Sequence, residues 1–219
     1  MKEILVTERI YHIFNKSIAE YKILNDSSDF LRLIETLRYY QKKRKVLSFS
    51  HFNRLQERIT QYPKNKETIK EDRKLVEIIA YCLMPTHVHL IIRQLEEKGI
   101  SIFMSNILNS YSRYFNIKHK RKGPLWEGRF RRILVENDEY LLHLTRYLHL
   151  NPVTAHLVDM PEKWLYSSYN EYLSDSSIDS RICKYDDVLD IKPAVYKEFV
   201  EDRIAYQREL AKIKTLLLE

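Results

Sequence analysis

Apolar residues recur along the chain at two spacings, every second position in some segments and every third or fourth position in others. Residues 9–14 are β-branched, aromatic and aliphatic, which predicts a first strand. From Phe30 to about Lys45 the apolar positions recur every three or four residues, which predicts a helix that begins after the turn and cap residues 25–28. The pattern over 47–62 predicts a short further helix, and residues 63–74 form a polar connection.

Two apolar runs, 75–82 and 87–93, flank residues 83–86 and predict an antiparallel hairpin. An amphipathic helix from Ile100, a strand over 130–135 and a helix capped by Asn137 or Asp138 are expected next. The buried stripe of that last helix is predicted to contain Tyr140, Leu141, Leu144 and Leu148. This order predicts an α+β, ferredoxin-like antiparallel sheet with helices on one face, plus an added helix.

The remainder of the chain has a different character. Residues 159–219 contain an aromatic stretch, a Ser- and Asp-rich linker near 174–180 and helical patterning from Asp186 to the end. We therefore expect a first domain over residues 1–158 and a helical C-terminal extension over 159–219.

Composition excludes several classes of protein. With 219 residues and 44% hydrophobic residues, the chain is expected to fold around a core. No apolar run approaches the roughly 18 residues of a membrane span and the N-terminus lacks a signal-peptide layout, so we expect a cytoplasmic protein without a membrane partner. Cys82 and Cys183 form no CxxC pair and are expected to be reduced thiols. Three glycines cannot build a P-loop or a GxGxxG loop, so no nucleotide cofactor is expected.

Most of the net positive charge lies in residues 118–132. This segment has seven basic residues against one acid, a net +6, whereas the whole chain carries +7. Basic residues with interleaved aromatic rings can neutralise phosphates and stack on bases, although a solvated surface loop explains such a segment equally well. The predicted nucleic-acid-binding residues are Lys118, Lys120, Arg121, Lys122, Trp126, Arg129, Arg131 and Arg132.

Candidate chemistry begins with His87 and His89 in the second strand of the predicted hairpin. Residues two apart in a strand point to the same face with Cα atoms about 6.6 Å apart, so two imidazoles can bind one divalent ion. Histidines that are simply satisfied polar groups are the more common explanation of such a pair.

Tyr147 and Asn151 lie four residues apart and share a face of the predicted helix. They add a phenol and an amide oxygen to the two imidazoles, and this set of groups suits metal-assisted transesterification. Asn151 has an alternative explanation, because Pro152 suits the first position of a new helix and would make Asn151 its N-cap. His143, four residues before Tyr147, is better explained as an exposed helical histidine.

Several motifs occur together in a fixed order. They are YCLMPTHVH (81–89), YFN (114–116), GPLWEGRF (123–130), YL (140–141) and RYLHLNPV (146–153). Together they resemble the single-tyrosine HUH transposases, and most of all the REP-associated tyrosine transposases. The resemblance covers roughly residues 7–158 and extends in weaker form to residues 164–169.

The resemblance implies the HUH endonuclease fold and makes residues 1–158 the catalytic domain. It implies a transposase that cleaves single-stranded DNA near palindromic hairpins and leaves a 5′-phosphotyrosine and a free 3′-OH. Tyr147 would be the nucleophile, His87 and His89 would bind Mg²⁺ or Mn²⁺, and Asn151 falls where relatives carry a Gln or Asn ligand. Such a protein acts as a monomer or a homodimer.

Two other classes of function remain open. A domesticated, non-catalytic nucleic-acid-binding protein would keep the fold and the basic surface, but the complete set of His, His, Tyr and Asn argues against it. A Zn-dependent hydrolase could use the histidine pair, but no HExxH, CxxC or evident third carboxylate ligand accompanies it.

Overall fold

The structure is a computed structural model that describes residues 4–43, 49–51, 73–174 and 181–217. Most of the predicted helix over 47–62 and of the connection over 63–74 lies outside these ranges, as does the linker over 175–180. Those expectations stay predictions.

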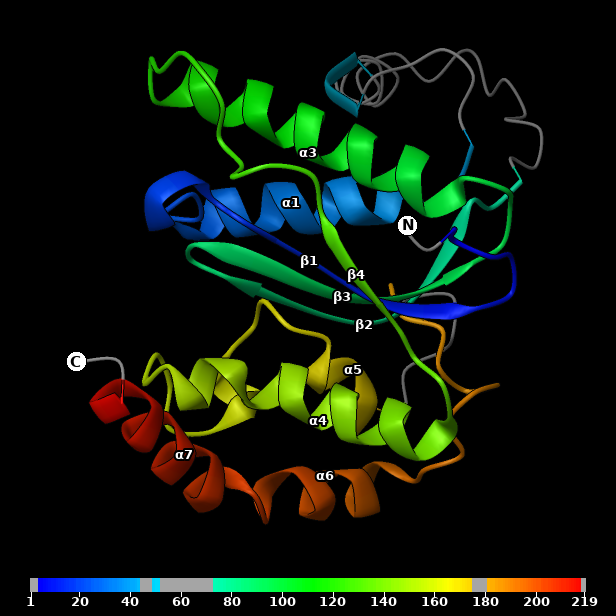
Figure 1. Ribbon diagram of the computed structural model, residues 1–219, viewed down its shortest axis with the longest axis vertical. Helices are drawn as coiled ribbons and strands as arrows, with labels where there is room; N and C mark the ends of the chain where they lie inside the picture. Colours follow the sequence, from blue (N-terminus) through cyan, green and yellow to red (C-terminus); the bar gives the residue numbers. More distant parts are fainter. Residues whose placement is uncertain (1–3, 44–48, 52–72, 175–180, 218–219) are drawn as a thin grey trace, which may run out of the picture.

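Four strands form one sheet in which every neighbouring pair is antiparallel (Figure 1). They are β1 (Ile10–Lys16), β2 (Val76–Met84), β3 (His87–Gln94) and β4 (Arg131–Leu134), in the order β2-β3-β1-β4. The predicted hairpin is confirmed, with Pro85 and Thr86 as its two-residue turn. The element order is that of the predicted ferredoxin-like arrangement.

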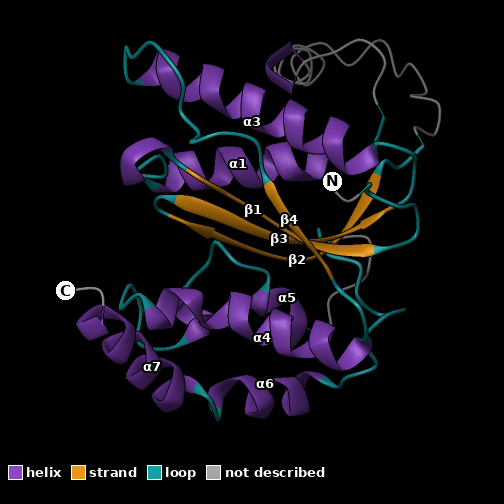
Figure 2. Cartoon of the chain, viewed as in Figure 1, coloured by secondary structure: helices purple, strands orange, loops and turns teal. Residues whose placement is uncertain are grey.

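Helices cover both faces of the sheet (Figure 2). On one side lie α1 (Ser27–Tyr40) and α3 (Gly99–Lys118), and on the other lie α4 (Asp138–Thr154) and α5 (Tyr169–Leu173). The outermost helices, α6 (Pro193–Glu201) and α7 (Ile204–Leu217), follow beyond α4 (Figure 1). Short 3-10 turns occupy Ile18–Glu20 and Pro161–Lys163. None of the described helices is both long and apolar enough to cross a membrane.

Helix α4 begins as the sequence predicts, but it continues past the point where the sequence suggests a break. The Asn137 side chain accepts a hydrogen bond from the backbone N–H of Tyr140, which caps the first turn. Pro152 lies inside the helix, so the interpretation of Asn151 as the N-cap of a new helix is wrong. Proline is tolerated here because its missing N–H removes only one hydrogen bond, and the Ala155 N–H still closes the last turn on the Asn151 carbonyl.

The buried stripe of α4 is only partly as predicted. Leu141, Leu144 and Leu148 are buried, but Tyr140 is 38% exposed. Because each residue of a helix is rotated by about 100° from the one before it, Tyr140 and Tyr147, seven residues later, lie on the same flank of α4. The two tyrosines therefore share this flank and differ in how far along the helix they lie.

The C-terminal extension shares the core of the sheet. Tyr169 and Tyr196 are fully buried, and the backbone groups of Tyr166, Ser168 and Lys184 hydrogen-bond to the outer edge of β2. Cys82 and Cys183 are buried free thiols in this region. The division at residue 158 stays a prediction, and the contacts across it form one continuous core.

Candidate active site

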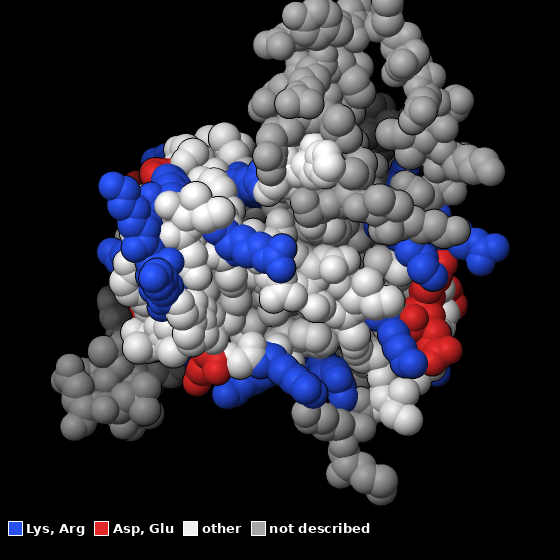
Figure 3. Space-filling model, turned by 90° about the horizontal axis from the view of Figure 1, so that it is seen from above, with Lys and Arg blue, Asp and Glu red and all other residues white. Residues whose placement is uncertain are grey.

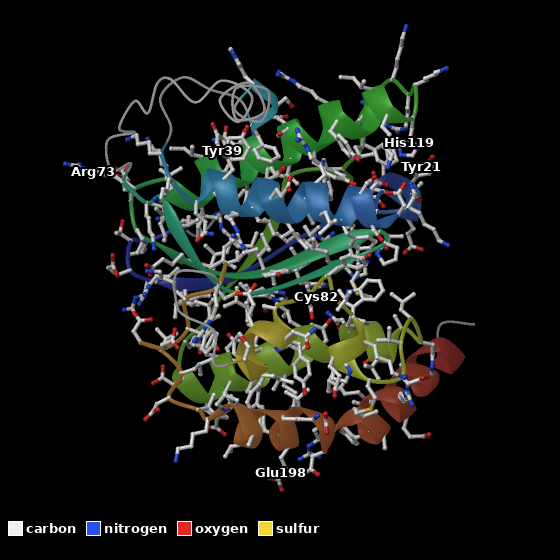
Figure 4. The ribbon with its side chains drawn as sticks, turned by 180° about the vertical axis from the view of Figure 1, so that it is seen from behind. Tyr21, Tyr39, Arg73, Cys82, His119 and Glu198 are labelled. Atoms are coloured by element: carbon white, nitrogen blue, oxygen red, sulfur yellow. The ribbon has the colours of Figure 1, made fainter. Side chains whose placement is uncertain are left out.

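The register of the sheet places five side chains of β1 and β3 on the face toward α4. Phe14 lies opposite His89, and Lys16 lies opposite His87. Residues two apart share a face, so His12 joins Phe14 and Lys16 there. Cys82 lies opposite His89 in β2 and is drawn between the sheet and the helices beneath it (Figure 4).

His87 and His89 approach each other as the strand spacing predicts. Their ring centroids are 5.0 Å apart. The Nδ1 atom of His87 is 2.9 Å from the Thr86 hydroxyl oxygen, and the Nδ1 atom of His89 is 3.0 Å from Nε2 of His12. Within the described part of the chain neither Nε2 atom makes a hydrogen bond, so each ring keeps one nitrogen available for a ligand.

Both imidazoles are neutral at physiological pH. Burial lowers the pKa of His87 to about 4, and the charge of Lys16 lowers it further in the same direction. Burial also lowers the pKa of His89 to about 2, with contributions from His87 and His12. Neutral imidazole is the form that binds a metal ion.

Tyr147 reaches this face from α4. Its ring centroid is 6.0 Å from that of His89, the two rings are nearly perpendicular, and the side chain is 41% exposed. Burial raises the pKa of the phenol, and the neighbouring Asn151 amide acts in the opposite direction. The phenol is therefore protonated at neutral pH and needs a nearby cation or base before it becomes a strong nucleophile.

A pocket of about 390 Å³ holds these groups together. It is lined by His12, Phe14, Asn15, Lys16, His87, His89, Ile133 and Tyr147. The structure thus brings three of the four residues predicted for the chemistry into one cavity, and the fourth, Asn151, lies one helical turn beyond Tyr147.

The side chains of this pocket can bind a divalent ion only if an amide oxygen joins the two imidazoles as a ligand. Within the described residues no cluster of three or more His, Cys, Asp and Glu side chains is arranged to hold a metal. Asn151 can supply this donor through its amide oxygen, because its side chain lies beside the Tyr147 hydroxyl. Two neutral imidazoles and one amide oxygen form an incomplete ligand set that leaves positions for water or phosphate oxygens.

Sequence reasoning missed His12, Phe14 and Lys16. The only signal was their spacing of two along the first strand, which places them on one face without saying which face meets the His pair. The pairing of β1 with β3 decides the question, and a single sequence does not reveal it.

The family model described as "Transposase IS200 like" matches residues 42–151, half of the chain. The chain belongs to this family. A Haemophilus influenzae protein described as a candidate REP-associated tyrosine transposase is 26% identical over 104 residues, which cover 43% of this chain and 59% of that relative. The chain thus spans less than two thirds of the length of this relative.

The fold of this member of the family matches a solved structure. That structure is of a REP-associated tyrosine transposase bound to a REP hairpin, with a TM-score of 0.52 and 16% sequence identity over 87% of this chain and 93% of the other. The predicted α+β fold of the HUH type is therefore confirmed.

Part of the basic segment stabilises the fold. The Lys118 ammonium lies 2.8 Å from a carboxylate oxygen of Asp26 and 2.7 Å from one of Asp29, which ties the end of α3 to the start of α1. Arg121 donates a hydrogen bond of 2.7 Å to the Pro124 carbonyl, and its guanidinium lies 5.7 Å from the ring centroid of Tyr21. Figure 4 shows Tyr21 close to His119, at this end of α3.

The prediction that Trp126 stacks on bases is not supported by its position. Trp126 is 9% exposed, and its indole N–H donates a hydrogen bond to the Leu108 carbonyl. Its ring centroid lies 6.2 Å from that of Tyr111, which is fully buried in α3. Apolar aromatic rings pack in a core for the same physical reason that they stack on bases, so composition alone cannot separate the two roles.

The other basic residues of the segment lie at separate places. Lys120 and Lys122 are exposed beyond the end of α3, and Arg129 and Arg131 are exposed near the pocket of the histidines, whereas Arg132 is half-buried. Figure 3 shows Lys and Arg side chains at several separated places on the face above α3, rather than in one continuous patch. The DNA-binding role of these residues stays a prediction.

Proposed function

We propose that this transposase is a metal-dependent endonuclease and strand transferase that nicks single-stranded DNA near hairpins through a 5′-phosphotyrosine. One observation carries the proposal: a phenol, Tyr147, shares a small open pocket with two neutral imidazoles whose Nε2 atoms are both available. Neither a binding module nor a hydrolase with a water nucleophile requires that phenol.

His87, His89 and Asn151 would hold the ion. Family members use Mg²⁺ or Mn²⁺, and two imidazole ligands favour Mn²⁺ over Mg²⁺. When bound, such an ion polarises the scissile phosphate and offsets the charge that develops on it.

Two hydrogen bonds prepare the imidazoles for this role. If Nδ1–H of His89 donates to Nε2 of His12, the Nε2 lone pair of His89 is left free, and Nδ1–H of His87 can donate to Thr86 in the same way. The Nδ1 contact of a ligand histidine fixes its tautomer and ring orientation. His12 and Thr86 thus act as positioning residues.

The Tyr147 oxygen would form a bond to phosphorus while the bond from phosphorus to the 3′ oxygen breaks. The phenol proton passes to water in the open pocket, and the leaving 3′ oxygen takes up a proton. One phosphodiester replaces another, so the reverse reaction can join strands without an external energy source.

The proposed partner is single-stranded DNA with hairpin elements, and the structurally similar transposase is bound to a REP hairpin. Lys16 lines the pocket of the phenol, and Arg129 and Arg131 line a smaller cavity that shares Lys16 with it, so all three can contact the phosphates of such a strand.

The test compares Tyr147→Phe with Tyr140→Phe. Both tyrosines lie on the same flank of α4 and are about equally exposed, at 41% and 38%, so Tyr140→Phe is a matched control. Each protein is incubated with Mn²⁺ and a labelled pool of single strands that carry a hairpin between random flanks. The wild type and Tyr140→Phe should form a covalent protein–DNA adduct that survives boiling in detergent, while Tyr147→Phe should bind the DNA and form none.

Other results would point to the alternatives. An adduct on Tyr147→Phe means that another tyrosine attacks. Cleavage by the wild type without any adduct indicates a water nucleophile and the Zn-dependent hydrolase, whereas binding without cleavage indicates a domesticated binding protein.

A further inference from the structure

A second and larger cavity lies next to the catalytic pocket. It has a volume of about 820 Å³, which falls within the range of about 300–1,000 Å³ typical of pockets for small organic ligands. It lies between β4, the segment before it and the first half of α3. We call it the α3/β4 groove.

The lining of the α3/β4 groove combines two kinds of surface. Ser101, Ser105 and Asn109 are four residues apart, so they form one polar ridge along α3. The groove is also lined by Phe130 and Ile133, and Ile133 is 45% exposed although it is apolar. A flat apolar group with polar edges would satisfy both surfaces.

The charge beside the groove is positive. Arg129 and Arg131 line it and are exposed, and within the described part of the chain neither guanidinium makes a hydrogen bond or an ion pair. Two uncompensated cations next to an apolar surface suit a ligand that carries a phosphate and an aromatic ring.

The groove is continuous with the catalytic pocket. Phe14 and Ile133 line both cavities, and Arg129 and Arg131 also line a smaller pocket of about 210 Å³ that includes Lys16. A strand of DNA with one phosphate at Tyr147 could therefore pass around the edge strand β4 without leaving these surfaces.

We propose that the α3/β4 groove binds one unpaired nucleotide of the DNA strand, close to the phosphate that Tyr147 attacks. The base packs against Phe130 and Ile133, Ser105 and Asn109 contact its polar edge, and Arg129 and Arg131 contact the adjoining phosphates. This inference rests on the proposed function, because it takes the occupant to be the strand that is cleaved. It assigns contacts to the polar edge of one base to Ser105 and Asn109 of α3, which lie outside the motifs of the family.

The experiment makes two changes: a substitution in the protein fills the groove, and an abasic site in the DNA removes the base. Ser105→Trp places a large side chain on the polar ridge, and Ile117→Trp is its control, because Ile117 is 79% exposed on the same helix and does not line the groove. Single strands with a hairpin between random flanks are first selected on the wild type. Dissociation constants of the selected strand are then measured with each nucleotide replaced in turn by an abasic site.

At one position near the cut, the abasic site should weaken binding to the wild type about tenfold, the effect of removing one stacked base. Ser105→Trp should bind the intact strand about tenfold more weakly and show no further weakening with that abasic site. Ile117→Trp should behave as the wild type does, and Mn²⁺ affinity measured by calorimetry should be the same in all three proteins.

The proposal is overturned if Ser105→Trp binds the intact strand as the wild type does, or if the abasic penalties of the two proteins are equal at every position. Should Ser105→Trp fail to fold, Asn109→Ala provides the same test, because it removes the polar contact without filling the groove and should abolish base preference at that position only. Adduct formation by the wild type is scored separately. A groove effect without an adduct refutes the proposed function alone, and an adduct without a groove effect refutes this inference alone.

Discussion

A buried histidine on α4 should make the stability of the protein depend on pH. His149 is fully enclosed, with Nδ1 at 2.6 Å from the Tyr196 hydroxyl and Nε2 at 2.8 Å from the Ser168 hydroxyl. These hydrogen bonds join α4, which carries Tyr147, to the C-terminal extension. Burial lowers the pKa of His149 from 6.5 to about 3.

The size of the effect follows from the difference between the two pKa values. Below pH 6.5 the unfolded chain binds a proton at His149 that the folded chain does not bind until about pH 3. The free energy of unfolding therefore falls as the pH is lowered through this window, by up to about 1.4 kcal/mol per pH unit. At pH 5 the decrease from this one group is about 2 kcal/mol relative to pH 8.

Urea denaturation of the wild type and His149→Gln between pH 8 and pH 5 measures this contribution. Glutamine keeps a polar side chain but does not titrate, and the other buried histidines contribute equally to both proteins. We expect the stability of the wild type to fall by about 2 kcal/mol more than that of the variant over this range. Parallel stability curves for the two proteins would refute the reasoning, because they would mean that His149 has the same pKa in the folded and unfolded chains.

Three further predictions concern the site and the basic segment. His12→Phe should weaken Mn²⁺ binding about 10- to 100-fold in calorimetry, because no hydrogen bond then orients the His89 ring; an unchanged affinity would remove His12 from the site. Replacing Arg129 and Arg131 by Gln should lower the log–log salt dependence of single-strand binding by about one unit for each phosphate that is no longer neutralised, and a wild-type slope would make both residues plain surface groups. Trp126→Ala should lower the free energy of unfolding by about 3–5 kcal/mol in urea denaturation. If Trp126→Ala instead keeps the wild-type stability and no longer binds DNA, Trp126 stacks on bases.

Periodicity predicted most of the fold because one face of each element is buried. In α3, Phe103, Ile107 and Tyr111 follow the helical spacing and are all buried. The first helix is capped by Asp26, within the predicted cap residues, and α4 by Asn137, because polar side chains at these positions satisfy free backbone N–H groups. Such signals are local, and they are visible in a single sequence.

The parts that were missed depend on contacts between distant segments. His12 lies 77 residues from His89, and only the register of β1 against β3 brings their rings together. The charge of Lys118 makes it a candidate DNA-binding residue, and its ion-pair partners, Asp26 and Asp29, cannot be recognised in the sequence because they lie far away, at the start of α1. Charge and residue type predict what a side chain can bind. The fold determines whether the side chain is already paired with another group of the protein.

The hydrogen bonds between the outer edge of β2 and the C-terminal extension affect the order in which the protein can fold during synthesis. The Tyr172 hydroxyl, which donates to the Ile79 carbonyl, lies 93 residues later in the chain. At about 5–20 residues per second, β2 leaves the ribosome roughly 5–20 s before the segment that covers it. Tyr147 and both histidines are made before Tyr172, so the last 25 residues of that interval, about 1–5 s, pass with these groups present and the extension that anchors α4 still incomplete. We therefore expect a nascent transposase to be unable to cut DNA until its C-terminal extension has folded.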